Sequence, residues 1–112
     1  RPETDSEGCL QDIHWTHGSL GYFPTYSLGS VLAAQLDAAM RDDLASEGEN
    51  VDALVRAGEF DPLHDWLTEH VHRHGCRYET DDLIREATGE PFTADHFLEY
   101  AREKFGDLYD LQ

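Results

Sequence analysis

The sequence predicts an all-α fold, a bundle of about five helices of which one is long and buried. Apolar residues recur at intervals of three and four along most of the chain, as they do on one face of a helix. Residues typical of helix ends, such as Gly48, Gly58 and Gly89, follow these segments. No segment shows the apolar–polar alternation of a half-buried strand bounded by turn residues. The shorter helices are therefore expected to pack against the long one.

The first part of the chain, residues 1–26, is expected to form a loop-rich segment that carries the functional residues. It contains the glycines Gly8, Gly18 and Gly21 within a mostly polar stretch. Closely spaced glycines favour turns and irregular backbone over regular helix. We therefore divide the chain into this segment and a helical region over residues 27–112.

The long helix is expected from Ser27 to about Ser46. Ser27 can cap its N-terminus, because a serine hydroxyl accepts a hydrogen bond from a backbone N–H two or three residues further on. The run from Val31 to Leu36 is apolar on nearly all sides, which indicates a buried helix.

Four shorter helices are expected after the long one, each with residues typical of helix ends. The first covers residues 51–56, and the second opens around Pro62 and ends at Gly75. Thr80 and Thr93 are expected to cap the last two helices. The apolar residues of the final helix follow helical spacing and are Phe97, Leu98, Ala101, Phe105 and Leu108.

The charge of the chain is strongly acidic, with 24 Asp and Glu residues against 8 Lys and Arg and a formal net charge of −16. Such a surface repels nucleic acid and anionic membranes, so neither is expected as a partner. Lys104 is the only lysine. Acid excess with so little lysine favours a halophilic source, because high salt screens the self-repulsion of a charged fold.

The sequence gives an expectation for location as well. No apolar run approaches the roughly 18 to 20 residues of a membrane-spanning helix, and no signal-peptide pattern is present. The two cysteines, Cys9 and Cys76, have no metal-ligand spacing. Low cysteine usage is typical of a cytoplasmic protein with reduced thiols.

The most informative short motif is Gln11-Asp12-x-His14-Trp15. A carboxylate beside a histidine can fix the tautomer of its ring and raise its basicity. Trp15 offers a flat apolar wall with one N–H donor. If this segment is helical, Gln11, His14 and Trp15 share a face. On spacing alone, a simple amphipathic turn with a hydrogen-bonded histidine is the favoured explanation of the motif.

The whole of residues 8–15 resembles the Gly-x-x-Gln-Asp-x-His-Trp signature of the thermostable (Taq-type) zinc metallocarboxypeptidases, with every fixed position present. Residues 21–29, Gly-Tyr-Phe-Pro-Thr-Tyr-Ser-Leu-Gly, are similar to the same family. Further similar blocks follow in order and extend the resemblance over the whole chain: Ala33-Ala34-Gln35-Leu36, Gly58-x-Phe60-x-Pro62, Ala87-Thr88-Gly89-Glu90-Pro91, Phe97-Leu98-x-Tyr100 and Leu108-Tyr109-x-Leu111.

The resemblance implies that the chain is the C-terminal part of a larger helical peptidase. Members of this family remove residues one at a time from peptide C-termini with broad specificity, and most are homodimers. They hold zinc, or another divalent metal such as cobalt, with an H-E-x-x-H helix and a further glutamate.

This sequence contains no H-E-x-x-H. We therefore expect the chain to bind no metal and to be inactive until it is joined to the rest of the same polypeptide. The alternative is a non-catalytic helical binding module derived from this family.

Peptide hydrolysis creates an oxyanion that needs hydrogen-bond donors aimed at it. Many helical zinc peptidases supply them late in the chain in a His-x4-Tyr-x3-Tyr arrangement, and His17, Tyr22 and Tyr26 have that spacing. We expect Tyr26 to be the oxyanion donor, Tyr22 to line the substrate groove and His17 to contact substrate. Simple packing of the tyrosines under a loop is the competing interpretation.

The resemblance also assigns roles within the first motif. His14 is expected to bind substrate or stabilise the tetrahedral intermediate. Gln11 and Asp12 would orient it, and Trp15 would line the substrate site. The predicted catalytic residues are thus Tyr26, His14 and Tyr22, and the predicted substrate-binding residues are Gln11, Asp12, Trp15 and His17.

Overall fold

The computed structural model describes residues 2–110, except for the side chain of Cys9. Within these residues the chain forms α-helices and short 3₁₀ helices and no strand, so the predicted all-α fold is confirmed. Leu111, part of the predicted helical region, lies outside the described residues. In chain order the elements are η1 (Asp5–Glu7), η2 (Cys9–Gln11), α1 (Ile13–Thr16), α2 (Pro24–Ser46), α3 (Val51–Ala57), α4 (Asp61–His70), η3 (His72–His74), α5 (Thr80–Thr88) and α6 (Asp95–Tyr109).

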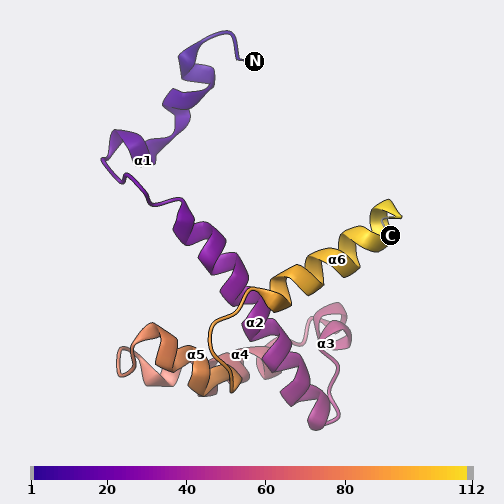
Figure 1. Ribbon diagram of the computed structural model, residues 1–112. Coiled ribbons are helices and arrows are strands. Elements are labelled where there is room, and N and C mark those ends of the chain that lie inside the picture. The colour runs from indigo at the N-terminus through magenta and orange to yellow at the C-terminus, as the bar shows by residue number, and fades with distance from the viewer. Residues whose placement is uncertain (1, 111–112) are drawn as a thin grey trace.

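Helix α2 is the longest helix of the described chain, and the other elements are arranged along it (Figure 1). Figure 1 shows α3, α4 and α5 gathered around its C-terminal half, whereas α6 leaves from its middle and the segment with α1 extends beyond its first turn. The molecule therefore has an open, branched outline, with principal extents of 54 × 43 × 29 Å.

Helix α2 begins at Pro24, three residues before the predicted cap at Ser27. Proline is well tolerated in a first helical turn, because the N–H that it lacks would have no partner there. Tyr26 consequently lies in the first turn of α2 and not in a loop. The boundary that we expected after residue 26 falls inside a continuous helix.

The burial predicted for the long helix holds over its C-terminal half only. Gln35, Met40 and Leu44 are buried, whereas residues 24–30 are all exposed. The apolar run of Val31 to Leu36 marks the transition between these halves. The first turns lie apart from helices α3, α4 and α5, which gather around the C-terminal half (Figure 1).

The main core forms where α3 and α4 pack against the C-terminal half of α2. Its buried residues are Met40, Leu44, Val51 and Trp66, and its partly buried neighbours are Leu36, Ala39, Leu63 and Leu67. The indole N–H of Trp66 donates a hydrogen bond of 2.8 Å to Asp43 on α2, so the one polar atom of this ring is satisfied. His70 stacks on the same indole, with 4.4 Å between ring centroids.

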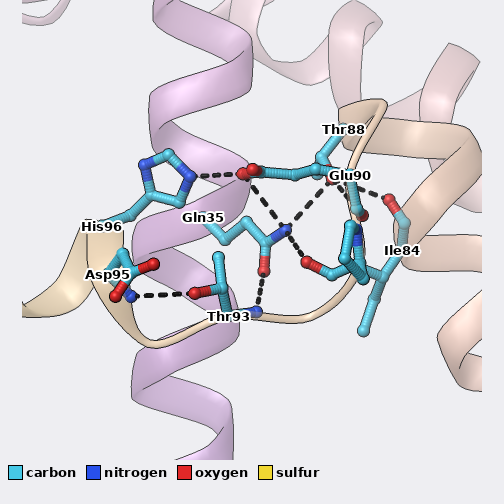
Figure 2. Close-up of polar contacts among 8 residues, drawn as sticks. Gln35, Ile84, Thr88, Glu90, Thr93, Asp95 and His96 are labelled. Atoms are coloured by element: carbon cyan, nitrogen blue, oxygen red, sulfur yellow. Dashed lines mark hydrogen bonds and ion pairs between the residues drawn. The ribbon is translucent and has the colours of Figure 1, made fainter.

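A buried glutamine joins α2 to the connection between α5 and α6. Gln35 is fully buried, and its amide nitrogen lies 3.0 Å from the Pro91 carbonyl oxygen and 3.2 Å from the Thr88 hydroxyl. Its amide oxygen accepts a hydrogen bond of 3.1 Å from the backbone N–H of Thr93. Figure 2 shows the side chain enclosed by this connection, with Glu90 between Gln35 and His96. We call this network the Gln35 joint.

Helix α6 is the least covered of the longer helices. The predicted cap at Thr93 is displaced by one residue, because the N-cap is Ala94, although the Thr93 hydroxyl accepts a hydrogen bond from the backbone N–H of Asp95. The predicted cap at Thr80 is displaced as well, since the N-cap of α5 is Glu79 and Thr80 is the first helical residue. Of the apolar positions predicted for this helix, Phe97 and Ala101 are half-buried, and the others are exposed: Leu98, Phe105 and Leu108. Among the described residues, no helix is long and apolar enough to cross a membrane.

Candidate active site

The site begins at Asp12, which caps the short helix α1. Its backbone is extended, and its carboxylate accepts hydrogen bonds from the backbone N–H groups of His14 at 3.1 Å and Trp15 at 3.3 Å. Satisfying these otherwise unpaired donors is what allows a helix to begin at Ile13. Gln11 ends the preceding 3₁₀ helix, so it does not share a helical face with His14 and Trp15 as expected.

The same carboxylate also holds the imidazole ring of His14. Asp12 Oδ1 lies 2.7 Å from His14 Nδ1, and both side chains are about three-quarters buried. Desolvation raises the pKa of Asp12. The hydrogen bonds from the His14 ring and from the backbone of His14 and Trp15 outweigh it, so this pKa lies below its ordinary value of 3.8. Asp12 is therefore an ionised, acceptor-only group at neutral pH, as its predicted orienting role requires.

The other ring nitrogen of His14 meets the predicted oxyanion donor. His14 Nε2 lies 3.1 Å from the hydroxyl oxygen of Tyr26, twelve residues further along the chain. Two left-handed glycines, Gly18 and Gly21, turn the chain back between them with φ of +75° and +79°. Side chains with a Cβ atom rarely adopt such angles, which explains the glycines in this loop.

Three aromatic rings surround the imidazole. Tyr22 stacks on His14 with 5.1 Å between centroids and 19° between planes, and Phe23 lies at 5.1 Å in a tilted geometry. Tyr26 meets Tyr22 edge to face at 5.3 Å. Phe23 was not among the predicted site residues, because a phenylalanine beside a proline carries no chemical signal. We refer to Asp12, His14, Tyr22, Phe23 and Tyr26 as the His14 cluster.

The structure brings together four of the seven predicted site residues. Within the described chain, the side chains of Gln11, Trp15 and His17 form no hydrogen bond with the His14 cluster. All three are exposed, and Trp15 is 64% exposed. His17 instead ends α1 through its backbone N–H. Their substrate contacts stay predictions.

The cluster can present a hydroxyl donor to a ligand. Tyr26 is 53% exposed and Tyr22 is 45% exposed, so both phenol groups are open to solvent. The opposite side of the His14 ring is occupied by Asp12. This arrangement is typical of a site in which a carboxylate orients a ring and an exposed hydroxyl meets the substrate.

The described residues do not fit a metal centre. Across residues 2–110, no group of three or more His, Cys, Asp or Glu side chains is placed to hold a metal ion. The chemistry available here is hydrogen bonding and aromatic contact.

The family model described as Carboxypeptidase Taq (M32) metallopeptidase matches residues 1–105 of this chain. Carboxypeptidase 1 of Bacillus subtilis is 47% identical over 110 residues, which are 98% of this chain and 21% of that protein. Thermostable carboxypeptidase 1 of Pyrococcus furiosus is 45% identical over 105 residues, 94% of this chain and 20% of that protein. The chain thus spans about one fifth of the length of these relatives.

Solved structures give the same picture. The crystal structure of BsuCP has a TM-score of 0.83 and 47% identity, covering 96% of this chain and 21% of that one. An M32 carboxypeptidase from Deinococcus radiodurans has a TM-score of 0.80 and 40% identity, covering 99% of this chain and 22% of that one. On the extent of the family match and these identities, the chain belongs to the Taq-type (M32) family of metallocarboxypeptidases.

Proposed function

We propose that this chain is the C-terminal part of a zinc-dependent carboxypeptidase that releases C-terminal amino acids from peptides with broad specificity. Its role is to supply side chains that bind substrate and stabilise the transition state. The observation that carries this proposal is the 3.1 Å contact between His14 and the exposed hydroxyl of Tyr26, on a ring that Asp12 holds in place. The relatives that are 45% and 47% identical to this chain are named carboxypeptidases.

The chemical role follows from what peptide hydrolysis requires. Attack on the scissile carbonyl places negative charge on its oxygen, and a preorganised donor stabilises that charge more than it stabilises the substrate. The Tyr26 hydroxyl is such a donor. Tyr22 lies beside it with its own hydroxyl-bearing ring exposed, in a position to line a substrate groove.

The metal of the proposed enzyme would be held elsewhere. No group of side chains within residues 2–110 is placed to hold zinc. From the resemblance we assign zinc, or another divalent metal such as cobalt, to an H-E-x-x-H helix in the rest of the same polypeptide. When bound, zinc activates water and polarises the carbonyl. This chain alone is expected to be inactive.

Two further proposals concern the whole protein. We propose from the resemblance that it forms a homodimer, which sedimentation of the intact protein would test. We also propose that it is cytoplasmic, from the low cysteine content of this chain, and adapted to high salt, from the net charge of −16 that this chain carries. Stability that rises steeply with added salt would support the adaptation, and complete folding in low-salt buffer would contradict it.

The direct test of the proposed function is Tyr26→Phe in the intact enzyme. Removing one oxyanion donor typically lowers kcat about 100-fold or more, with a smaller effect on KM. Steady-state kinetics on a short peptide would measure both constants. The matched control is Tyr100→Phe on α6, a half-exposed tyrosine whose hydroxyl pairs with Lys104. It is expected to leave kcat within about twofold, since its hydroxyl is not aimed at substrate. The same small change for Tyr26→Phe would reject the donor role.

A further inference from the structure

We propose that Asp12 is a positioning residue that decides, through His14, whether the Tyr26 hydroxyl can donate a hydrogen bond to substrate. The inference rests on the proposed role of Tyr26 as oxyanion donor. It adds that Asp12 and His14 determine when the Tyr26 hydroxyl is free to donate. It follows from the order of the three groups: Asp12 Oδ1 lies 2.7 Å from His14 Nδ1, and His14 Nε2 lies 3.1 Å from the Tyr26 hydroxyl.

The first step concerns Nδ1 of His14. An ionised carboxylate has no hydrogen to donate, so a hydrogen bond between Asp12 and Nδ1 requires the hydrogen to be on Nδ1. The Asp12 carboxylate is already fixed by the backbone N–H groups of His14 and Trp15, so it cannot turn away without uncapping α1. The geometry therefore sets one tautomer of the neutral ring.

The second step concerns Nε2. When Nδ1 of a neutral imidazole carries the hydrogen, Nε2 has only a lone pair and can only accept. The 3.1 Å contact must then be a hydrogen bond donated by the Tyr26 hydroxyl to His14. A tyrosine hydroxyl has a single hydrogen. While His14 is neutral, that hydrogen is directed at the ring and not at a ligand.

The third step is protonation of His14. In the imidazolium both nitrogens donate, so Nε2–H donates to the Tyr26 oxygen. The Tyr26 hydrogen is then free to point at the oxyanion. The other side chains that pack against the ring are Tyr22, from the loop, and Phe23, at the start of α2. Asp12 is thus the one carboxylate that faces His14 within the described chain.

The expected consequence is a loss of activity on the alkaline side. If only the imidazolium form releases the Tyr26 hydrogen, kcat falls about tenfold per pH unit above the midpoint at which His14 loses its proton. We call this fall of kcat with rising pH the alkaline limb. It reports the release of the Tyr26 hydrogen, and a purely structural role of Asp12 or His14 would not produce it.

The first experiment reads the tautomer without activity. Nitrogen-15 NMR of the intact, metal-free enzyme labelled at histidine would follow both ring nitrogens of His14, assigned by loss of its signals in His14→Gln. The expected result is that Nδ1 keeps its hydrogen and Nε2 lacks one at alkaline pH. A neutral ring with hydrogen on Nε2 would overturn the proposal.

The second experiment compares pH profiles of kcat in the loaded enzyme. The wild-type limb should coincide with the His14 midpoint found by NMR. In His14→Gln the side-chain amide can donate to Tyr26 and does not titrate, so the limb should vanish. Asp12→Ser keeps a helix-capping hydroxyl but no longer holds the hydrogen of neutral His14 on Nδ1. Across the pH range in which wild-type kcat falls, kcat of this variant should fall less than about threefold. Asp5→Asn, which removes an exposed acid in the same segment, should leave the limb unchanged.

The outcomes separate the two proposals. If Tyr26→Phe leaves kcat within about twofold of wild type, the donor role itself is wrong. If Tyr26→Phe lowers kcat about 100-fold but the wild-type limb does not follow His14, then Tyr26 reaches substrate from a neutral His14 as well. That result would reject the proposal that Asp12 determines when Tyr26 can donate, and it would leave the proposed function intact.

Discussion

The two tryptophans of this chain lie in opposite environments. Trp66 is 6% exposed, packs in the core below the C-terminal half of α2 and has its N–H satisfied by Asp43. Trp15 lies next to the His14 cluster and is 64% exposed. The same contrast separates Gln35, which is fully buried and bonded on both sides, from the exposed Gln11.

The difference shows how the two ends of α2 are stabilised. The C-terminal end is held by contacts between distant parts of the chain, and the partners of Gln35 are more than fifty residues away. The His14 cluster is held by short-range contacts, two residues from Asp12 to His14 and twelve from His14 to Tyr26. One end has its own core, and the other is an uncovered set of oriented side chains.

The largest predicted effect tests the core directly. Trp66→Ala removes a buried indole and leaves Asp43 without its donor, so it should lower the free energy of unfolding by about 3 to 5 kcal/mol. Trp15→Ala, the matched control, should change it by less than about 0.5 kcal/mol, because an exposed side chain loses little packing. Urea denaturation followed by circular dichroism would measure both. Equal effects would mean that the two ends are not independent.

A smaller effect is predicted at the Gln35 joint. Gln35→Leu keeps a similar volume but leaves the Thr93 N–H and the Pro91 carbonyl without their partner. Buried groups left unsatisfied in this way cost about 1 to 3 kcal/mol. The exposed Gln11→Leu should be close to neutral in the same unfolding experiment. A neutral Gln35→Leu would show that water replaces the lost hydrogen bonds and that the joint does not order the α5–α6 connection.

The smallest predicted effect is local and depends on pH. The pKa of Asp12 is lowered in the folded chain, so its carboxylate stabilises α1 fully above its ordinary value of 3.8. This stabilisation is lost as the pH falls through the lowered pKa. The carboxyl-carbon NMR shift of Asp12 should therefore titrate with a midpoint below 3.8, and the core signals should not change with it. A midpoint at or above 3.8 would contradict the hydrogen-bond network around Asp12.

Much of the architecture was predictable because helix ends carry local chemistry. Gly58 and Gly89 adopt left-handed conformations at the ends of α3 and α5, as their positions after apolar runs indicated. The start of α2 was less predictable, because Ser27 and Pro24 are both acceptable near a helix N-terminus, and the helix begins at Pro24. In the site, the pairing of Asp12 with His14 was predicted from a separation of two residues.

The sequence by itself determined the family, the helical class and the nearest neighbours of His14, because these depend on motifs and on interactions within a few residues. Tertiary structure alone decided that Tyr26 lies against His14, that Phe23 joins the cluster and that Gln35 binds the α5–α6 connection. It also decided which half of α2 is buried. An apolar helix face is buried only where another element packs on it, and the buried residues of α2 are Gln35, Met40 and Leu44.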